Sequence, residues 1–481
     1  MSDPFEQRTL SLAEKDKRYV WHPFTPMKQW MQDDPMIIEG GEGFELIDTD
    51  GRRYVDGFSS LWCNLHGHRV PQIDAAIRDQ LENVAHTTLL GFASPPSIEL
   101  GERLVRISPE PLKRVFYSDS GATAVEIALK MAYQYYRNVG QPERRRFLAL
   151  RHSYHGDTIG SVSLGGINTF HEIFHELLFE TTFVDTPNPY HNEHGEQAMH
   201  VVLNQIDETL RDFPGEYCAL VLEPLMQGAA GMVCQPEGFL AGVRKLCDKH
   251  DVLLIADEVA VGFGRTGKLF ACEHEKVVPD LLCLAKGISG GYLPLAATVV
   301  TDAVDAAFTG ELSDRRTLFH GHTYTGNPLA CAVAIESLKK FSRPVAKRSE
   351  DAEHNASDTD ASDDQRFSPD LLTHIRKSAS LIKDRLEPLR DCRRVADIRQ
   401  RGIMVGIEVC EDRAAPDGPK PFDFAALTAR RLTNAMREHG VIVRNLGDVV
   451  ILMPIPAMPH DTLEKLCDAV VKTILEWPIE G

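Results

Sequence analysis

The sequence predicts an α/β fold in which a large domain, with a mostly parallel sheet between helices, is joined to a smaller α+β domain. Within residues 115–300, short apolar runs alternate with amphipathic helical stretches; the runs lie at 114–117, 219–222, 252–256 and 281–285. Strands that are apolar on both faces are typical of a parallel sheet covered by helices on both sides. Ligands bind beyond the carboxyl ends of such strands, so the residues that follow each run are the candidates for chemistry.

The pattern divides the chain into three parts. Residues 1–71 contain short strands with turn signals and are expected to contribute to the small domain, 72–330 form the large domain, and 331–481 form the C-terminal small domain. This last part is expected to contain helices at 369–390 and 423–439 and strands within 392–410 and 441–455.

An acidic insert at 347–366 interrupts the C-terminal part. It carries seven acidic residues and no apolar side chain larger than alanine. Such a segment cannot bury enough apolar surface to order itself, so we expect a disordered surface loop. An acidic docking segment is the alternative.

Charge and cysteine usage exclude several classes of protein. The chain has 52 lysines and arginines and 70 aspartates and glutamates, which give a net charge of −18. This negative charge argues against binding to nucleic acid or to an anionic membrane. No run approaches the roughly 18 apolar residues of a membrane span. The ten cysteines form no CxxC pair, and residues 1–18 show no secretory signal, so a reducing cytoplasm is expected.

Two literal motifs are rejected on their context. Residues 171–175 match HExxH, but no third zinc ligand follows at a suitable spacing, so we expect an amphipathic helix and no metal. Residues 262–269 nearly match a phosphate loop, but Leu269 replaces the hydroxyl that binds Mg²⁺ and no convincing helix begins there. A glycine-rich turn lining a pocket is the simpler interpretation.

A carboxylate and an amine follow two neighbouring apolar runs. Asp257 comes directly after the run at 252–256, and Lys286 comes directly after the run at 281–285. A buried carboxylate needs a cationic partner, and a lysine beside apolar surface has a lowered pKa and becomes nucleophilic. A ligand shared by both residues is therefore expected.

Two further features complete one cofactor site. Residues 118–123 lie between a strand and a helix, and their glycine and capping hydroxyl suit a phosphate at the helix N-terminus. Tyr154 supplies an aromatic ring just before a turn. A phosphate site, a carboxylate for a pyridine nitrogen, an imine-forming lysine and a stacking ring together indicate pyridoxal 5'-phosphate.

With these residues placed, the sequence resembles the class III, fold-type I aminotransferases over nearly its whole length. The resemblance rests on Asp257-Glu258-Val259, Gly262-Phe263-Gly264-Arg265-Thr266-Gly267, Glu223-Pro224 with Gln227-Gly228, and Thr325-Gly326-Asn327-Pro328-Leu329-Ala330. Within the class, the segments at 21–25, 56–62, 154–158 and 320–323 look like the group that aminates 8-amino-7-oxononanoate in biotin synthesis.

The resemblance implies a role for each matching residue around the cofactor. Lys286 would form the imine and shuttle the proton, Asp257 would keep the pyridine nitrogen protonated, and Tyr154 would stack on the ring. The remaining cofactor-binding positions are Gly121, Ala122, Gln227, Val259, His322 and Thr323. Thr323 would reach in from a second subunit, which implies a homodimer with shared active sites.

The resemblance also implies a substrate channel. Arg444 would pair with the carboxylate of the keto acid, and Tyr154 and Lys286 would face the same cleft. Its other walls would be Phe24, Leu61, Trp62 and Gly321. Ala122 stands where many members have serine, and Phe24 and Leu61 stand where they have tyrosine and the first tryptophan of a pair.

The amino donor stays open at this stage. The default of the group is S-adenosylmethionine, whereas a smaller group uses lysine, which Phe24 and the segment 322–325 resemble more closely. The base rate favours S-adenosylmethionine. The alternatives are an ω-amino acid:pyruvate aminotransferase of the same class and a catalytically silent pyridoxal-phosphate-binding protein, against which the presence of both Asp257 and Lys286 argues.

Overall fold

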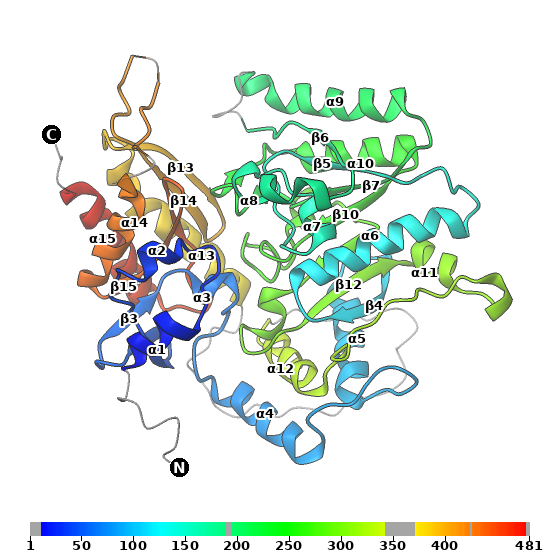
Figure 1. Cartoon of the computed structure of the whole chain (residues 1–481), viewed down its shortest axis with the longest axis horizontal. Coiled ribbons are helices and arrows are strands. Elements are labelled where there is room, and N and C mark those ends of the chain that lie inside the picture. The colour runs from blue at the N-terminus through cyan, green and yellow to red at the C-terminus, as the bar shows by residue number, and fades with distance from the viewer. Residues whose placement is uncertain (1–10, 189–193, 342–370, 417, 424–425, 478–481) are drawn as a thin grey trace, which may run out of the picture.

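The computed structural model describes residues 11–188, 194–341, 371–416, 418–423 and 426–477. A seven-stranded sheet with its helices occupies one side of the molecule, and two four-stranded sheets with their helices occupy the other (Figure 1).

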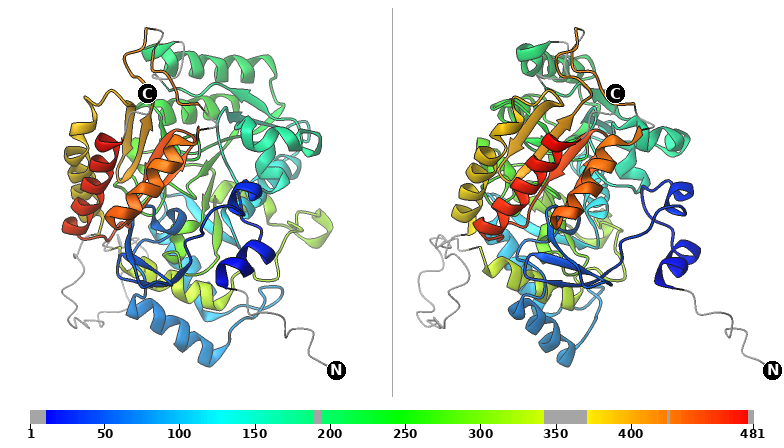
Figure 2. Two further views of the ribbon diagram at one scale, coloured as in Figure 1. Left: turned by 60° about the vertical axis from the view of Figure 1, so that its left-hand side comes forward. Right: turned by 90° about the vertical axis from the view of Figure 1, so that its left-hand side faces the viewer.

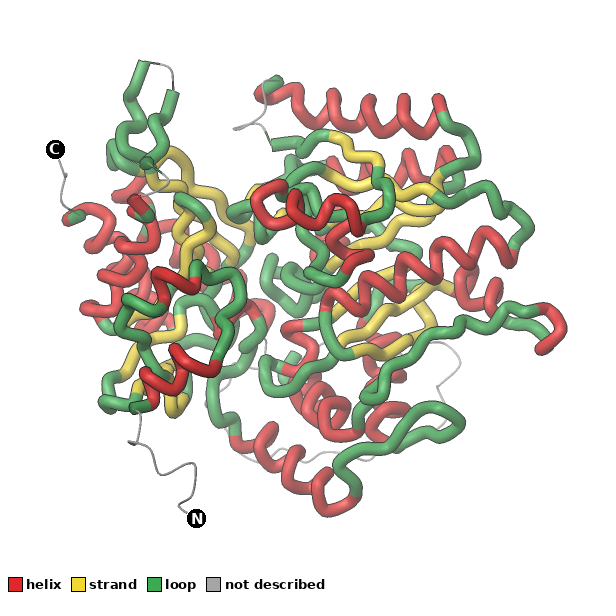
Figure 3. Tube along the Cα trace, in the orientation of Figure 1, coloured by secondary structure: helices red, strands yellow, loops and turns green. Residues whose placement is uncertain are grey.

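The seven-stranded sheet has the order β4-β12-β11-β10-β7-β5-β6. Its strands are β4 (Leu112–Ser118), β5 (Arg146–Leu150), β6 (Thr182–Val184), β7 (Tyr217–Leu222), β10 (Leu253–Asp257), β11 (Leu281–Leu284) and β12 (Ala296–Thr301). Strand β12 pairs antiparallel with β4 and β11, and every other neighbouring pair is parallel. The predicted α/β class with a mostly parallel sheet is confirmed, and the strands lie between helices in Figure 3.

Both faces of this sheet are buried, which explains the continuously apolar strands. Along β10, Leu254 and Ala256 face a core cluster that includes residues of α5 (Pro95–Ile107), α10 (Phe239–His250) and α12 (Pro328–Lys339). Leu253 and Ile255 point to the opposite side, into a cluster with α6 (Gly121–Asn138). Alternate residues of β10 therefore pack against helices on opposite faces of the sheet, and neither face of the sheet can be polar.

The smaller side of the molecule draws on both ends of the chain. One sheet contains β1 (Ile38–Glu42), β2 (Glu45–Asp48), β3 (Arg53–Asp56) and β15 (Val441–Ile442); the other contains β13 (Val395–Arg401), β14 (Met404–Val409), β16 (Arg444–Leu446) and β17 (Val449–Leu452). Strand β3 pairs parallel with β15, so the N-terminal segment lies beside the C-terminal part, as Figure 2 also shows.

The remaining elements are short connections and covering helices. They are α1 (Leu12–Tyr19), α2 (Met27–Trp30), α3 (Ser59–Trp62), α4 (Pro71–Asn83), α7 (Ile159–Ser163), α8 (Asn168–His171), α9 (Ala198–Asp212), α11 (Asp302–Phe308), α13 (Leu371–Arg385), α14 (Thr428–Ala435), α15 (His460–Glu476) and the hairpin β8 (Met226–Gln227) with β9 (Val233–Cys234). None of the helices in the described ranges has the length and hydropathy needed to cross a bilayer.

The predicted domain boundary at 330 falls inside a helix. Helix α12 continues to Lys339 and packs against α4 and α5. We propose that the division between the large and small domains falls after this helix. The acidic insert at 347–366 lies outside the described residues.

Candidate active site

A cavity of about 450 Å³ opens at the carboxyl ends of β10 and β11. Asp257 is the last residue of β10 rather than the first residue after it, and Lys286 follows the end of β11 by two residues. The two strands are parallel neighbours, so these ends meet at one edge of the sheet. The cavity is lined by Trp62, Ser120, Gly121, Ala122, Tyr154, His155, Gly156, Asp157, Thr158, Glu223, Ala229, Asp257, Val259, Ala260 and Lys286.

Lys286 is a half-buried amine with a lowered pKa. Burial lowers the pKa of its ammonium group, while the nearby carboxylates of Asp257 and Glu223 act in the opposite direction. Its Nζ lies 5.5 Å from the centre of the Trp62 ring. An amine with a lowered pKa is uncharged, and therefore nucleophilic, in a larger fraction of molecules at neutral pH.

Asp257 is buried and is oriented by two donors. Its Oδ2 accepts a hydrogen bond from His155 Nδ1 at 2.8 Å, and its Oδ1 accepts one from the backbone N–H of Val259 at 3.0 Å. His155 is only 3% exposed, and its Nε2 has no partner among the described residues. Sequence reasoning did not assign His155, although it directly follows Tyr154.

Glu223 adds a second buried carboxyl group beside Asp257. It accepts hydrogen bonds from the backbone N–H groups of Tyr154 at 3.2 Å and Gly228 at 2.9 Å. Burial raises its pKa to about 7. Its role was also missed, since the sequence analysis used it only as part of a motif.

The N-terminus of α6 also lines the cavity. Ser120 Oγ accepts from the N–H of Thr123, which forms a capping box, whereas Gly121 and Ala122 belong to the first turn, whose N–H groups have no intrahelical partner. A Cβ on Gly121 would lie 2.6 Å from a methyl of Val259, so no other residue fits there. The helix start therefore offers backbone donors to an anion.

Tyr154 belongs to an aromatic wall. Its hydroxyl donates to Asp157 Oδ2 at 2.6 Å, and its ring lies 6.4 Å from that of Phe170 and 6.3 Å from that of His171. Phe170 in turn contacts Phe24, with 5.3 Å between ring centres. The N-terminal segment thus reaches the same wall.

Arg444 has a half-buried guanidinium group that pairs with no described residue. Burial lowers its pKa, and the Tyr154 side chain acts on that pKa in the opposite direction. An unpaired guanidinium of this kind is suited to bidentate binding of a carboxylate.

Leu61 and Trp62 stand on a turn with an unusual backbone. All four residues of α3 have positive φ: 52° for Ser59, 49° for Ser60, 73° for Leu61 and 68° for Trp62. Left-handed helical conformation costs a non-glycine residue about 1–2 kcal/mol. Trp62 is nearly buried beside the cavity, whereas Leu61 is 47% exposed.

Some predicted residues lie away from the cavity. Gln227 is buried and donates through Nε2 to the carbonyl of Arg151 at 2.8 Å, but it does not line the cavity. His322 binds Asp119 Oδ2 at 2.7 Å, next to the start of α6, whereas Gly321 and Thr323 are exposed.

The HExxH segment does not form the single amphipathic helix that the sequence predicted. Helix α8 ends at His171, and a 3₁₀-helix covers Glu172–Leu177. The His171 side chain is buried, whereas that of His175 is exposed, so the two imidazoles do not converge.

The glycine-rich segment Gly262–Leu269 contains a buried charged residue, because Arg265 is only 1% exposed.

Comparisons with known proteins agree with this geometry. Residues 27–474 match the family Aminotransferase class-III. The chain is 49% identical over 473 residues to an adenosylmethionine-8-amino-7-oxononanoate aminotransferase of Nitratidesulfovibrio vulgaris, covering 97% of this chain and 82% of that protein. It is 42% identical to the protein of that name from Geobacter sulfurreducens, covering 97% and 98% of the two chains.

Solved structures give the same result. The crystal structure of the Methanocaldococcus jannaschii protein of that name has a TM-score of 0.86 at 39% identity, covering 96% of this chain and 98% of that one. An amine transaminase from an uncultivated Pseudomonas species, in its PLP-bound form, has a TM-score of 0.84 at 32% identity, covering 95% and 98%.

Aminotransferases of this class depend on pyridoxal 5'-phosphate, so the predicted cofactor is confirmed. The cavity fits that cofactor, because a half-buried amine, an oriented carboxylate and the free N–H groups of a helix N-terminus surround one space. The chain belongs to the class III aminotransferases.

Proposed function

We propose that the chain transfers an amino group to 8-amino-7-oxononanoate, forming 7,8-diaminononanoate in biotin biosynthesis, with S-adenosylmethionine as donor. The observation that carries this proposal is the cavity in which Lys286, Asp257 and the start of α6 meet. Arg444, which is half-buried and pairs with no described residue, would take the carboxylate of the keto acid. Relatives with 42–49% identity that are named for this reaction support it.

Pyridoxal 5'-phosphate, when bound, supplies an electron sink and carries the amino group between the two substrates. Lys286 would hold it covalently through Nζ. Once displaced by an amine, the same Nζ would take a proton from the donor carbon and return one to the acceptor carbon. The lowered pKa of Lys286 suits this exchange, because a general base works best with a pKa near the working pH.

Asp257 would accept a hydrogen bond from the pyridine N–H and so keep that nitrogen protonated. His155 and the Val259 N–H hold the carboxylate in one orientation for this contact. The backbone amides of Gly121 and Ala122 would bind the phosphate, with His322 and Thr323 contributing nearby. Gln227, which is buried and does not line the cavity, would act on the phenolic oxygen.

The proposed substrate channel would run between Lys286 and Arg444 and would have apolar and aromatic walls. Phe24, Tyr154, Leu61 and Trp62 would contact the aliphatic chain, and Arg444 would pair with its carboxylate. Gly321 would line the channel from the exposed loop of a second subunit. With the substrate bound, these walls would exclude water from the reacting amine and so strengthen each electrostatic contact.

We also propose that the chain forms a homodimer through the loops around residues 84–94 and 315–327. Leu90, Phe92 and Phe319 are 87%, 69% and 82% exposed. The two loops are adjacent, since the His86 and Tyr324 rings lie 4.6 Å apart. Exposed apolar patches of this kind mark protein interfaces, and Thr323 lies in the same loop.

A cytoplasmic location belongs to the same proposal. All ten cysteines are free, and seven of them are buried, as expected of a protein in a reducing compartment.

The donor is tested by mixing the purified holoenzyme separately with S-adenosylmethionine and with lysine at equal concentration. The visible absorbance of the bound cofactor should fall faster with S-adenosylmethionine. Loss of absorbance with lysine alone would refute this donor and favour the lysine-dependent reaction, whereas a response only to small ω-amino acids would favour the ω-amino acid:pyruvate alternative. The proposed dimer is tested by light scattering, in which a monomer mass would refute it.

A further inference from the structure

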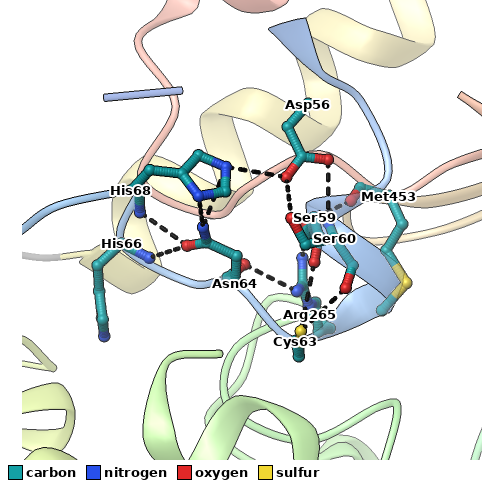
Figure 4. Close-up of polar contacts among 10 residues, drawn as sticks. Asp56, Ser59, Ser60, Cys63, Asn64, His66, His68, Arg265 and Met453 are labelled. Carbon is teal, nitrogen blue, oxygen red and sulfur yellow. Dashed lines mark hydrogen bonds and ion pairs between the residues drawn. The ribbon is translucent and has the colours of Figure 1, made fainter. Parts of the chain in front are cut away.

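The left-handed turn Ser59–Trp62 is held by buried polar groups that the sequence analysis did not assign (Figure 4). Without glycine, a sequence does not adopt four consecutive left-handed residues unless its surroundings enforce them. The backbone bonds of the turn run from Trp62 N to Phe58 O and from Cys63 N to Ser59 O. These bonds alone do not distinguish this conformation from a right-handed turn.

Asp56 binds the turn from one side. It is fully buried, and its Oδ1 accepts from the backbone N–H of Ser60 at 2.9 Å while its Oδ2 accepts from Ser60 Oγ at 2.7 Å. His68 Nε2 lies 3.2 Å from the same Oδ2. The two oxygens of the Asp56 carboxylate therefore hold Ser60, the second left-handed residue of the turn, through its backbone N–H and its hydroxyl.

Arg265 binds the turn from the other side. Its NH1 donates to Ser59 Oγ at 3.1 Å and to the carbonyl of Pro454 at 2.8 Å, and its NH2 donates to the carbonyl of Asn64 at 3.1 Å. The Ser59 hydroxyl in turn donates a hydrogen bond to the carbonyl of Met453 at 2.5 Å. The planar guanidinium of Arg265 thereby connects the start of the turn with Asn64, just after the turn, and with Pro454, just after β17.

The turn presents two side chains toward the chemistry. Trp62 lies over Lys286 Nζ, and a Cβ on Gly228 would lie 3.2 Å from the Trp62 ring. Leu61 stands next to it and is 47% exposed. A right-handed turn over the same residues would send these two side chains in other directions, because φ sets where each Cβ points.

We propose that Asp56 and Arg265 are positioning residues for substrate binding. They hold Ser59–Trp62 in its left-handed conformation, and this conformation sets the wall that Leu61 and Trp62 present to the long aliphatic chain of the keto acid. The proposal rests on the proposed function for the class of substrate. It assigns a role to two buried charged residues that contact neither the cavity nor the reacting atoms.

The test uses the different backbone freedom of glycine and alanine at position 60. Both lack the hydroxyl of Ser60, but glycine adopts positive φ without steric cost and alanine does not. Asp56→Asn is therefore measured in the parent chain, in Ser60→Gly and in Ser60→Ala, all as holoenzymes.

We expect Asp56→Asn to raise the KM for 8-amino-7-oxononanoate about tenfold in the parent and in Ser60→Ala, because a bond to a charged acceptor is lost. In Ser60→Gly the same substitution should change KM less than about threefold, because the turn no longer needs enforcement. The kcat at saturation should change less than KM. An equal effect of Asp56→Asn in the glycine and alanine backgrounds, or no effect in the parent, would overturn the proposal.

Asp48→Asn is the matched control. Asp48 is 2% exposed at the end of β2 and accepts from Tyr54 Oη at 3.0 Å, but it makes no contact with the turn. Loss of the Asp48 carboxylate should lower the melting temperature of the protein and leave the KM for 8-amino-7-oxononanoate unchanged. If it raised KM as Asp56→Asn does, the effect would be general instability and the proposal would be wrong.

Arg265→Lys tests the second residue, since lysine cannot supply the fork of donors. Like Asp56→Asn, it should raise the KM for 8-amino-7-oxononanoate. An unchanged KM would show that Arg265 is not a positioning residue. If Asp56→Asn alone unfolds the chain, Ser60→Gly and not Ser60→Ala should restore a folded protein. Failure in both backgrounds would overturn the proposal.

A spectroscopic readout separates this inference from the proposed function. Near-ultraviolet circular dichroism reports the environments of all four tryptophans, and the Trp62 contribution is identified as the difference between the parent and Trp62→Phe. This contribution should change in Asp56→Asn and return in the Ser60→Gly background. A parent enzyme that does not use 8-amino-7-oxononanoate would refute the proposed function, and the dichroism would still decide whether Asp56 holds the turn. An unchanged spectrum in Asp56→Asn would contradict the proposal.

Discussion

His155 Nδ1 lies 2.8 Å from Asp257 Oδ2, and both side chains are almost fully buried. A carboxylate in such a place needs a donor to fix its direction, and the Val259 N–H occupies only its other oxygen. His155 therefore determines how Asp257 faces the cavity.

His155→Gln should lower kcat about tenfold to a hundredfold, because a hydrogen bond to a charged group is lost at the residue that orients the pyridine nitrogen. Steady-state kinetics with saturating substrates measures this. His66→Gln is the control, because His66 is also buried and binds Ser337 Oγ at 2.9 Å outside the cavity. Equal losses in both variants would show that His155 contributes only to stability.

Lys286→Ala should keep the fold and lower turnover by at least roughly a thousandfold, because the covalent attachment and the proton transfer are lost together. Product formation over hours, followed by mass spectrometry, gives the required sensitivity. Turnover near the parent rate would show that another residue carries the amine chemistry.

Arg444→Ala should raise the KM for the keto acid about tenfold to a hundredfold, because a bidentate bond to its carboxylate is lost. The methyl ester of the same keto acid lacks that charge and serves as control. The parent and the variant should handle the ester equally. A KM for the free acid that does not change would place the carboxylate elsewhere.

Glu223 predicts a pH dependence of stability. Burial raises its pKa from 4.5 to about 7, so between these pH values the folded state holds a proton that the unfolded state has released. The free energy of unfolding should therefore fall as pH rises through this window, by on the order of 3 kcal/mol for Glu223.

Glu223→Gln should remove the contribution of Glu223 to this fall when urea unfolding is measured between pH 4.5 and 8, whereas the contribution of Glu258 should remain. Glu258→Gln is the matched comparison, since burial also raises the pKa of Glu258 to about 7 and it lies outside the cavity lining. A fall of the same size in the parent and in Glu223→Gln would mean that Glu223 is ionised in the fold at all these pH values.

The HExxH segment should bind no catalytic metal. Its two histidines do not converge, because His171 is buried at the end of α8 and His175 is exposed on the following 3₁₀-helix. Treatment with a chelator, and His175→Ala, should leave activity unchanged. Stoichiometric zinc in the purified protein, with activity lost on its removal, would contradict this.

The sequence predicted the parts of this structure that depend on local pattern. The apolar runs at 252–256 and 281–285 correspond to β10 and β11, and their ends bring Asp257 and Lys286 to one cavity. Helix α6 was predictable from its capping hydroxyl and its apolar face.

Features that depend on contacts distant in sequence were not predictable. His155 and Asp257 are 102 residues apart, and no local pattern links them. The left-handed turn at Ser59–Trp62 contains no glycine, so sequence rules assign it no positive φ; it exists because Asp56 and Arg265 enforce it. The antiparallel direction of β12 is likewise set by its place between β4 and β11.

The proposed reaction of this chain is amination of the keto carbon of 8-amino-7-oxononanoate. The most direct test incubates the purified holoenzyme with 8-amino-7-oxononanoate and S-adenosylmethionine and analyses the products by mass spectrometry. The expected product is 7,8-diaminononanoate, formed by the parent and at least roughly a thousandfold more slowly by Lys286→Ala. Absence of that product with either S-adenosylmethionine or lysine, together with amination of pyruvate by small ω-amino acids, would contradict it.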